Sequence, residues 1–190
     1  MLKRLSVTAA IFAATAAPAF AHLGPEEHGS FMAGLTHPLS GADHMLAMIA
    51  VGLWAAQIGG RARSAVPAAF VSLMAFGFLL ALVGAPLPFV ESGILASVIG
   101  LGLLVALAVR IPVAISAAIV GVFALFHGHA HGGELGAATA LTFGLGFIAA
   151  TAALHAVGIG LGVLVGSRSL VATRTLGALT AMGGAWLAFS

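Results

Sequence analysis

Charged and polar side chains are scarce in this 190-residue chain. It contains no cysteine and no tyrosine, and only 6% of its residues are charged, whereas an average soluble domain has about 25%. Without cysteine, the chain can form neither disulfides nor thiolate metal sites. So few charges cannot cover a surface that faces water, which excludes a soluble globular domain. The mean hydropathy of +1.17 excludes a disordered chain.

Basic residues are also few, and they form no patch. The formal net charge is only +2 and Lys3 is the one lysine, so nucleic acid is excluded as a partner. No G-x-x-x-x-G-K motif occurs, and an ATP-driven pump would therefore need another subunit. What remains is an integral membrane protein, in which every polar group within the bilayer is a functional candidate.

Residues 1–21 have the pattern of a secretory signal peptide. Lys3 and Arg4 precede a short apolar stretch, and Ala19-Phe20-Ala21 fits the small-x-small cleavage rule. We expect cleavage after Ala21; a retained first transmembrane helix is the alternative. The mature chain, 22–190, would be a single permease domain that begins with His22. The amine and imidazole of His22 could chelate a metal ion.

The mature chain contains six segments that are long and apolar enough to cross a bilayer, which takes about 20 residues. Turn-forming glycines and prolines separate them. We therefore predict an all-α, polytopic membrane protein with six transmembrane helices. Their expected ranges are Phe31–Ile58, Val66–Gly84, Glu91–Arg110, Pro112–His129, Leu135–Val165 and Arg168–Phe189.

The distribution of charge predicts the orientation of these helices. Basic residues mark the cytoplasmic side, and five arginines fall at alternate helix ends. Both mature termini are therefore expected in the periplasm of a bacterial inner membrane. The opposite, acidic face would concentrate cations, and Glu91 is a candidate for this role, although a helix N-terminus alone also favours an acid. The arginines are Arg61, Arg63, Arg110, Arg168 and Arg174.

The first predicted helix contains a compact polar group, His37, Asp43 and His44. The two histidines are seven residues apart, about two turns of a straight helix, so they share a stripe. Asp43 then points about 100° away from His44. Either the helix is irregular near Pro38 and Gly41, or the carboxylate does not bind the metal itself but hydrogen-bonds to a metal-binding imidazole and fixes its tautomer. Burying an aspartate here costs about 2.5–3.5 kcal/mol, which favours a functional role over a structural hydrogen bond.

A second group, His127, His129, His131 and Glu134, lies at the outer end of the fourth predicted helix. Imidazole and carboxylate ligands suit Ni, Co, Zn or Cu(II). A spacing of two residues does not match one helical face, so we expect part of this group to be non-helical. A solvated histidine-rich loop without a role is the alternative.

One histidine lies alone near the middle of the fifth expected helix. His155 could continue a metal path inward, with Met45 and Met48 as further candidates, or it could pack two helices together.

The two polar groups resemble the motifs of the HupE/UreJ family of nickel permeases. The family pattern H-P-x-x-G-x-D-H is matched by residues 37–44, and F-H-G-x-A-H-G-x-E is matched by residues 126–134. The resemblance covers nearly the whole chain. It implies transport of Ni²⁺ or Co²⁺ for hydrogenase or urease maturation, without a prosthetic group and without enzymatic activity.

Two other classes remain as alternatives. Ser40 with His37, Asp43 and His44 could form an intramembrane zinc hydrolase. The third class is a membrane metal sensor or an assembly partner of a larger complex. The sequence leaves the preferred metal, the energy source and the oligomeric state open, with a homo-oligomer among the alternatives.

Overall fold

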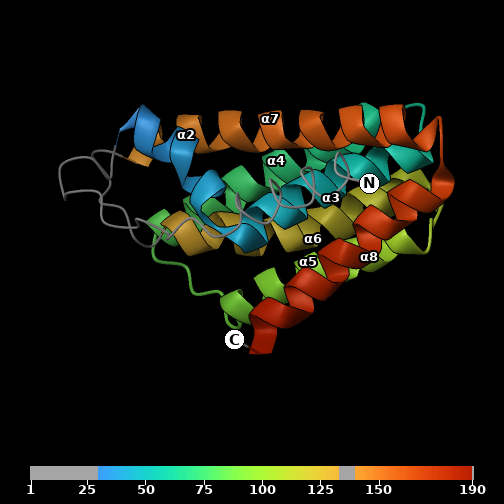
Figure 1. The fold of residues 1–190 in the computed structure, drawn as a ribbon. Coiled ribbons are helices and arrows are strands. Elements are labelled where there is room, and N and C mark those ends of the chain that lie inside the picture. Colours follow the sequence, from blue (N-terminus) through green and yellow to red (C-terminus); the bar gives the residue numbers. More distant parts are fainter. Residues whose placement is uncertain (1–29, 133–139, 190) are drawn as a thin grey trace, which may run out of the picture.

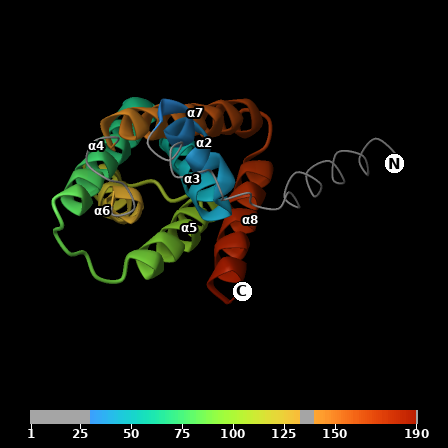
Figure 2. The same ribbon diagram turned by 90° about the vertical axis from the view of Figure 1, so that its left-hand side faces the viewer.

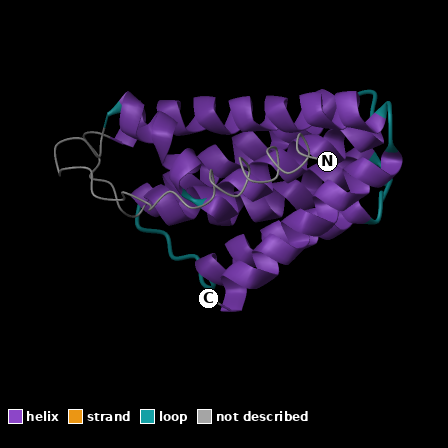
Figure 3. Cartoon of the chain, in the orientation of Figure 1, coloured by secondary structure: helices purple, strands orange, loops and turns teal. Residues whose placement is uncertain are grey.

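Seven α-helices and no strand make up residues 30–132 and 140–189, the part of the chain that the computed structural model describes (Figures 1 and 3). The predicted signal peptide, His22 and Glu134 lie outside these residues. The all-helical class is confirmed. The helices are α2 (Phe31–Ser40), α3 (Ala42–Ile58), α4 (Ala62–Leu82), α5 (Val90–Ala106), α6 (Val113–Gly132), α7 (Ala140–Gly166) and α8 (Leu170–Phe189).

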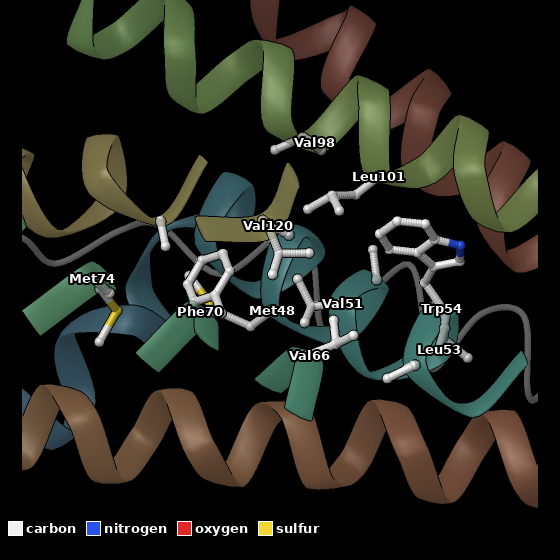
Figure 4. Close-up of a cluster of buried hydrophobic side chains, with 14 of the residues drawn as sticks. Met48, Val51, Leu53, Trp54, Val66, Phe70, Met74, Val98, Leu101 and Val120 are labelled. Atoms are coloured by element: carbon white, nitrogen blue, oxygen red, sulfur yellow. The ribbon is translucent and has the colours of Figure 1, made fainter. Parts of the chain in front are cut away.

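Helix α3 is the centre of the bundle. It contacts each of the other six helices, and the end-on view shows α4 and α6 on one side of it and α8 on the other (Figure 2). Every residue from Ala50 to Ala55 is buried, because an apolar sequence without a polar face is stable only when it is surrounded. Side chains of α3 such as Met48 and Trp54 form the core together with Phe70 of α4 and Val98 of α5 (Figure 4).

The first predicted helix is not continuous. The chain bends by 86° between α2 and α3, and Gly41 at the break has an extended backbone (φ −99°, ψ 120°). A Cβ atom on residue 41 would lie 2.7 Å from Oδ1 of Asp43, so glycine leaves room for that carboxylate. The expectation of a straight stripe through His37 and His44 is therefore wrong, and the alternative of an irregular helix is correct.

Glycines bring two pairs of helices into close contact. A Cβ atom on Gly128 of α6 would overlap the backbone of Met74 in α4, and Gly52 of α3 meets Gly158 of α7 in the same way. Small residues allow this close approach between membrane helices. As a result, the face of α6 that contains His127 points into the bundle.

Helix α5 ends at Ala106, before the predicted end at Arg110. Ala108 has a positive φ of 52°, which turns the chain out of the helix. Side chains of α3 and α8 bind carbonyl groups in the last turn of α5 and just after it, where fewer partners are available within the helix. Trp54 Nε1 donates to Val109 O (2.9 Å), Gln57 Nε2 to Val105 O (3.0 Å) and Arg174 Nε to Ala106 O (2.7 Å).

Three of the described helices, α4, α6 and α7, are long and apolar enough to cross a membrane, and the bent pair α2–α3 would be a fourth. The chain is thus an all-helical membrane protein, although this count is smaller than the six spans predicted. The connections α3–α4, α5–α6 and α7–α8 meet at one end of the bundle. There Arg63, Arg110 and Ser167 line a cavity of about 230 Å³. We call this end the arginine end.

Candidate functional site

Four histidines from three helices meet at the other end of the bundle. His37 lies in the last turn of α2, His44 in the first turn of α3, and His127 and His131 near the end of α6. Ring centroids are 4.4 Å apart for His37 and His131, and 4.6 Å apart both for His44 and His131 and for His44 and His127. We call these four residues, with Asp43, the histidine cluster.

The three histidines of the second polar group lie in a helix, although the two-residue spacing predicted that part of this group is non-helical; Glu134 lies outside the described residues. Helix α6 continues through all three histidines to Gly132. His127 and His131 are four residues apart and share its inner face. His129 points elsewhere and donates from Nε2 to the carbonyl oxygen of Ala85 at 2.8 Å. The alternation of histidines therefore separates them into two faces and does not break the helix.

A row of hydrogen bonds connects three of the imidazoles to the carboxylate. His44 Nδ1 lies 3.2 Å from Asp43 Oδ1, His131 Nε2 lies 2.8 Å from His44 Nε2, and His37 Nε2 lies 2.9 Å from His131 Nδ1. An ionised carboxylate can only accept, and a neutral imidazole has one donor and one acceptor. Asp43 therefore accepts from His44, which accepts from His131, which accepts from His37. One carboxylate thus sets the tautomers of three rings.

Asp43 also binds the backbone. Its Oδ1 accepts from the amide of His44 at 2.7 Å, and the Asp43 side chain is 27% exposed. The sequence left two possibilities open for Asp43: an irregular helix that brings it near both histidines, or a carboxylate that orients an imidazole. The structure has both features, since the helix bends at Gly41 and the carboxylate accepts from His44. Asp43 is the one carboxylate in contact with these histidines among the described residues.

The row of imidazoles is not a closed metal cage. His131 contacts His37 through Nδ1 and His44 through Nε2, and these two nitrogens point in opposite directions from one ring. Within residues 30–132 and 140–189, no three His, Asp or Glu side chains are arranged to hold a metal ion together. The arrangement offers successive pairs of nitrogens, and an ion can bind both members of a pair only when the shared proton moves to the other nitrogen of the donor ring.

His127 extends the cluster inward. It is fully buried, its Nε2 lies 2.7 Å from the hydroxyl of Ser97 in α5, and its Nδ1 has no partner in the described part of the chain. Sequence analysis missed Ser97. Its hydroxyl within an apolar helix was the available signal, since polar groups in membrane helices mark functional candidates.

Aromatic rings form the apolar wall of the cluster, and no sequence signal distinguished them from ordinary core residues. Phe147 of α7 lies 5.0 Å from His131, 6.2 Å from His44 and 6.4 Å from His37, measured between ring centroids. Phe70 of α4 contacts two rings, His127 at 5.7 Å and His155 at 5.1 Å. Such a wall keeps water away and strengthens every polar interaction inside it.

His155 lies apart from the cluster on α7. Only 1% of it is exposed, and neither ring nitrogen has a partner among the described residues. Through Phe70 it is linked to His127. Met48 belongs to the same buried core as Phe70 (Figure 4), whereas Met45 is half-buried.

Glu91 is not part of the histidine cluster. It is exposed in the first turn of α5, and its side chain forms no hydrogen bond or ion pair with another described residue.

Comparison with known proteins agrees with the motifs. The family described as HupE / UreJ protein matches residues 10–187. "Protein HupE" of Rhizobium leguminosarum bv. viciae is 49% identical over 171 residues, which cover 89% of each chain. No solved structure matches the chain. The match over nearly its whole length, together with the two histidine motifs that meet in one cluster, shows that the chain belongs to the HupE/UreJ family.

Proposed function

We propose that this protein is a secondary permease that carries Ni²⁺ across the bacterial inner membrane into the cytoplasm, where nickel enzymes such as hydrogenase or urease are matured. The observation that carries this proposal is the row of imidazoles that ends on Asp43. The family to which the sequence belongs, and the scarcity of any other polar group in the bundle, support it.

The chemistry of the row suits a transported ion. Neutral imidazole is a good ligand for divalent nickel, and one half-buried carboxylate offsets part of its charge. Transport requires binding that is strong enough for entry and weak enough for release, which several partial sites provide better than one closed cage. Paired nitrogens that exchange a hydrogen bond for a metal bond meet this requirement.

Each group has a place in the proposed path. Glu91 and Glu134 attract the ion at the periplasmic mouth, and His22 adds a ligand there after signal-peptide removal. His37, Asp43 and His44 with His127 and His131 form the central relay, and His155 receives the ion further inward. His129, which donates to Ala85 O, supports the loop before α5. In this proposal the chain spans the membrane six times, with both mature termini in the periplasm.

The hydrolase alternative finds less support in the geometry. Its nucleophile would be Ser40, but this side chain is exposed and its hydroxyl donates to the carbonyl oxygen of His37 at 2.7 Å. It makes no contact with an imidazole of the cluster. Cobalt transport by the same ligands remains the second candidate, because Co²⁺ accepts the same nitrogen donors.

Uptake of ⁶³Ni²⁺ by proteoliposomes that contain only this protein tests the proposal. We expect uptake above that of empty liposomes, and near-complete loss in Asp43→Asn at normal membrane abundance. Asn keeps the shape and can still accept from the His44 amide, but it removes the charge and no longer fixes the direction of the hydrogen bonds.

Three outcomes separate the alternatives. No uptake by the wild-type protein would refute transport by this chain alone. Near-normal uptake by Asp43→Asn would reduce Asp43 to a structural role. Stronger competition by Co²⁺ than by unlabelled Ni²⁺ would favour the cobalt permease.

A further inference from the structure

Ser97 contacts the histidine cluster from α5 through His127, a ring that lies beside His44 but outside the hydrogen-bonded row. It is fully buried, and its hydroxyl oxygen has two neighbours at hydrogen-bond distance. These are the carbonyl oxygen of Ile94 at 2.6 Å, one helical turn earlier, and Nε2 of His127 at 2.7 Å.

The two contacts determine where the protons lie. A hydroxyl has one proton, and a carbonyl oxygen can only accept. Ser97 therefore donates to Ile94, which leaves its lone pairs for His127. His127 must then be the donor, so Nε2 carries its proton and Nδ1 carries the lone pair.

The lone pair on Nδ1 of His127 is buried and unused in the described part of the chain, although buried acceptors are nearly always satisfied. The ring is packed edge-on against His44, with centroids 4.6 Å apart. A cation that binds Nδ1 of His127 during transport would account for this unused acceptor.

We propose that Ser97 is a positioning residue that holds His127 in its Nε2-protonated tautomer, so that Nδ1 can bind the transported divalent cation next to His44. Asp43 performs the same task for His44 from the other side. The identity of the ion rests on the proposed function; the assignment of the tautomer does not.

Three variants of Ser97 separate hydrogen bonding from packing. Ser97→Ala removes the hydroxyl, and Ser97→Cys nearly keeps the volume but offers only a weak acceptor. Ser97→Thr keeps the hydroxyl, which can still donate to the preceding turn. We expect the KM for Ni²⁺ to rise about tenfold or more in the Ala and Cys variants, as is usual when a partner behind a metal-binding imidazole is lost, and to stay within about twofold in the Thr variant.

Ser116→Ala is the matched control. Ser116 is equally buried and donates to the carbonyl oxygen of Pro112 at 3.2 Å, but it contacts no histidine. Its KM should not change. If Ser97→Cys retains the wild-type KM, or if Ser116→Ala raises it as much as Ser97→Ala does, the effect is one of packing and the proposal is wrong.

¹⁵N NMR of the full-length protein with labelled histidine reads the tautomer without any transport. His127→Gln identifies the signal of His127. We expect a protonated Nε2 and an unprotonated Nδ1 in the wild type, Ser97→Thr and Ser116→Ala, with loss of the hydrogen-bonded Nε2–H signal in Ser97→Ala. A wild-type His127 protonated at Nδ1 would overturn the proposal even if nickel uptake is confirmed. Absence of uptake would refute the proposed function and leave the NMR result interpretable.

Discussion

The two ends of the bundle use polar side chains in different ways. At the histidine cluster, side chains bind one another: three imidazoles and Asp43 form a row, and a fourth imidazole binds Ser97. At the arginine end, side chains bind the backbone, since Trp54, Gln57 and Arg174 all donate to carbonyl oxygens in the last turn of α5 or just after it.

This difference indicates a functional role for the polar side chains of the histidine cluster and a structural role for those of the arginine end. Donors that bind near the end of a helix give further partners to backbone carbonyl groups there, which is a structural role. Imidazoles that bind imidazoles can instead bind a metal ion through the nitrogen that holds the lone pair, because the ring proton can sit on either nitrogen. Polar groups are rare in the apolar bundle as a whole. Of the two regions, as far as the structure describes them, only the histidine cluster contains the imidazole ligands that a divalent transition metal prefers.

The largest effect is expected at the centre of the cluster. His131 is the ring that links His37 to His44, whereas His129, two residues earlier, binds only the carbonyl oxygen of Ala85. We expect His131→Ala to lower nickel uptake at least tenfold, which corresponds to about 1.4 kcal/mol or more in binding. His129→Ala should lower it by less than about twofold.

Uptake of ⁶³Ni²⁺ at one subsaturating concentration, normalised to membrane abundance, measures both variants. They remove the same ring from neighbouring positions of one helix, so each controls for the other. Equal losses would mean that His129 also lies on the path and that the division of α6 into two faces has no functional meaning.

The sequence predicted the members of the cluster but not its shape. Asp43 and the histidines could be identified because intramembrane polar groups are rare, and the apolar runs between turn residues placed the helices to within a few residues. The bend at Gly41 could not be predicted with certainty, since it depends on the space that the Asp43 carboxylate occupies. The continuation of α6 through His131 depends on its contact with α4 at Gly128, which is a tertiary effect.

The residues that sequence analysis missed were missed for physical reasons. Phe70 and Phe147 have the composition of any membrane core, and their role follows from contacts across helices. Helix α5 ends four residues earlier than predicted because Ala108 adopts a positive φ. Side chains from helices distant in sequence bind carbonyl oxygens near this end. Contacts of this kind join residues that are 48 to 68 positions apart, a range over which local patterns carry no information.

A change at the arginine end should affect stability and leave transport intact. Trp54→Phe removes the donor to Val109 O and part of a fully buried ring. We expect a loss of about 2 kcal/mol in stability, from one unsatisfied carbonyl and a small cavity. The melting temperature in detergent should fall, while the KM for Ni²⁺ per folded molecule stays unchanged. A raised KM at normal stability would show that the two ends are coupled.

The smallest effect is expected for Glu91, which is exposed and makes no contact with the cluster. A unit charge and a divalent ion about 10 Å apart in water attract each other by about 0.8 kcal/mol, which raises the local ion concentration about threefold to fourfold. Glu91→Gln should therefore reduce uptake by this factor at trace nickel and have no effect at saturation. Glu91→Asp, which keeps the charge, should behave as the wild type, and raising the salt concentration should reduce the difference between the variants because exposed charges are screened. If Glu91→Gln remains impaired at saturating nickel, Glu91 binds the ion directly, and the path begins at α5 and not at the histidine cluster.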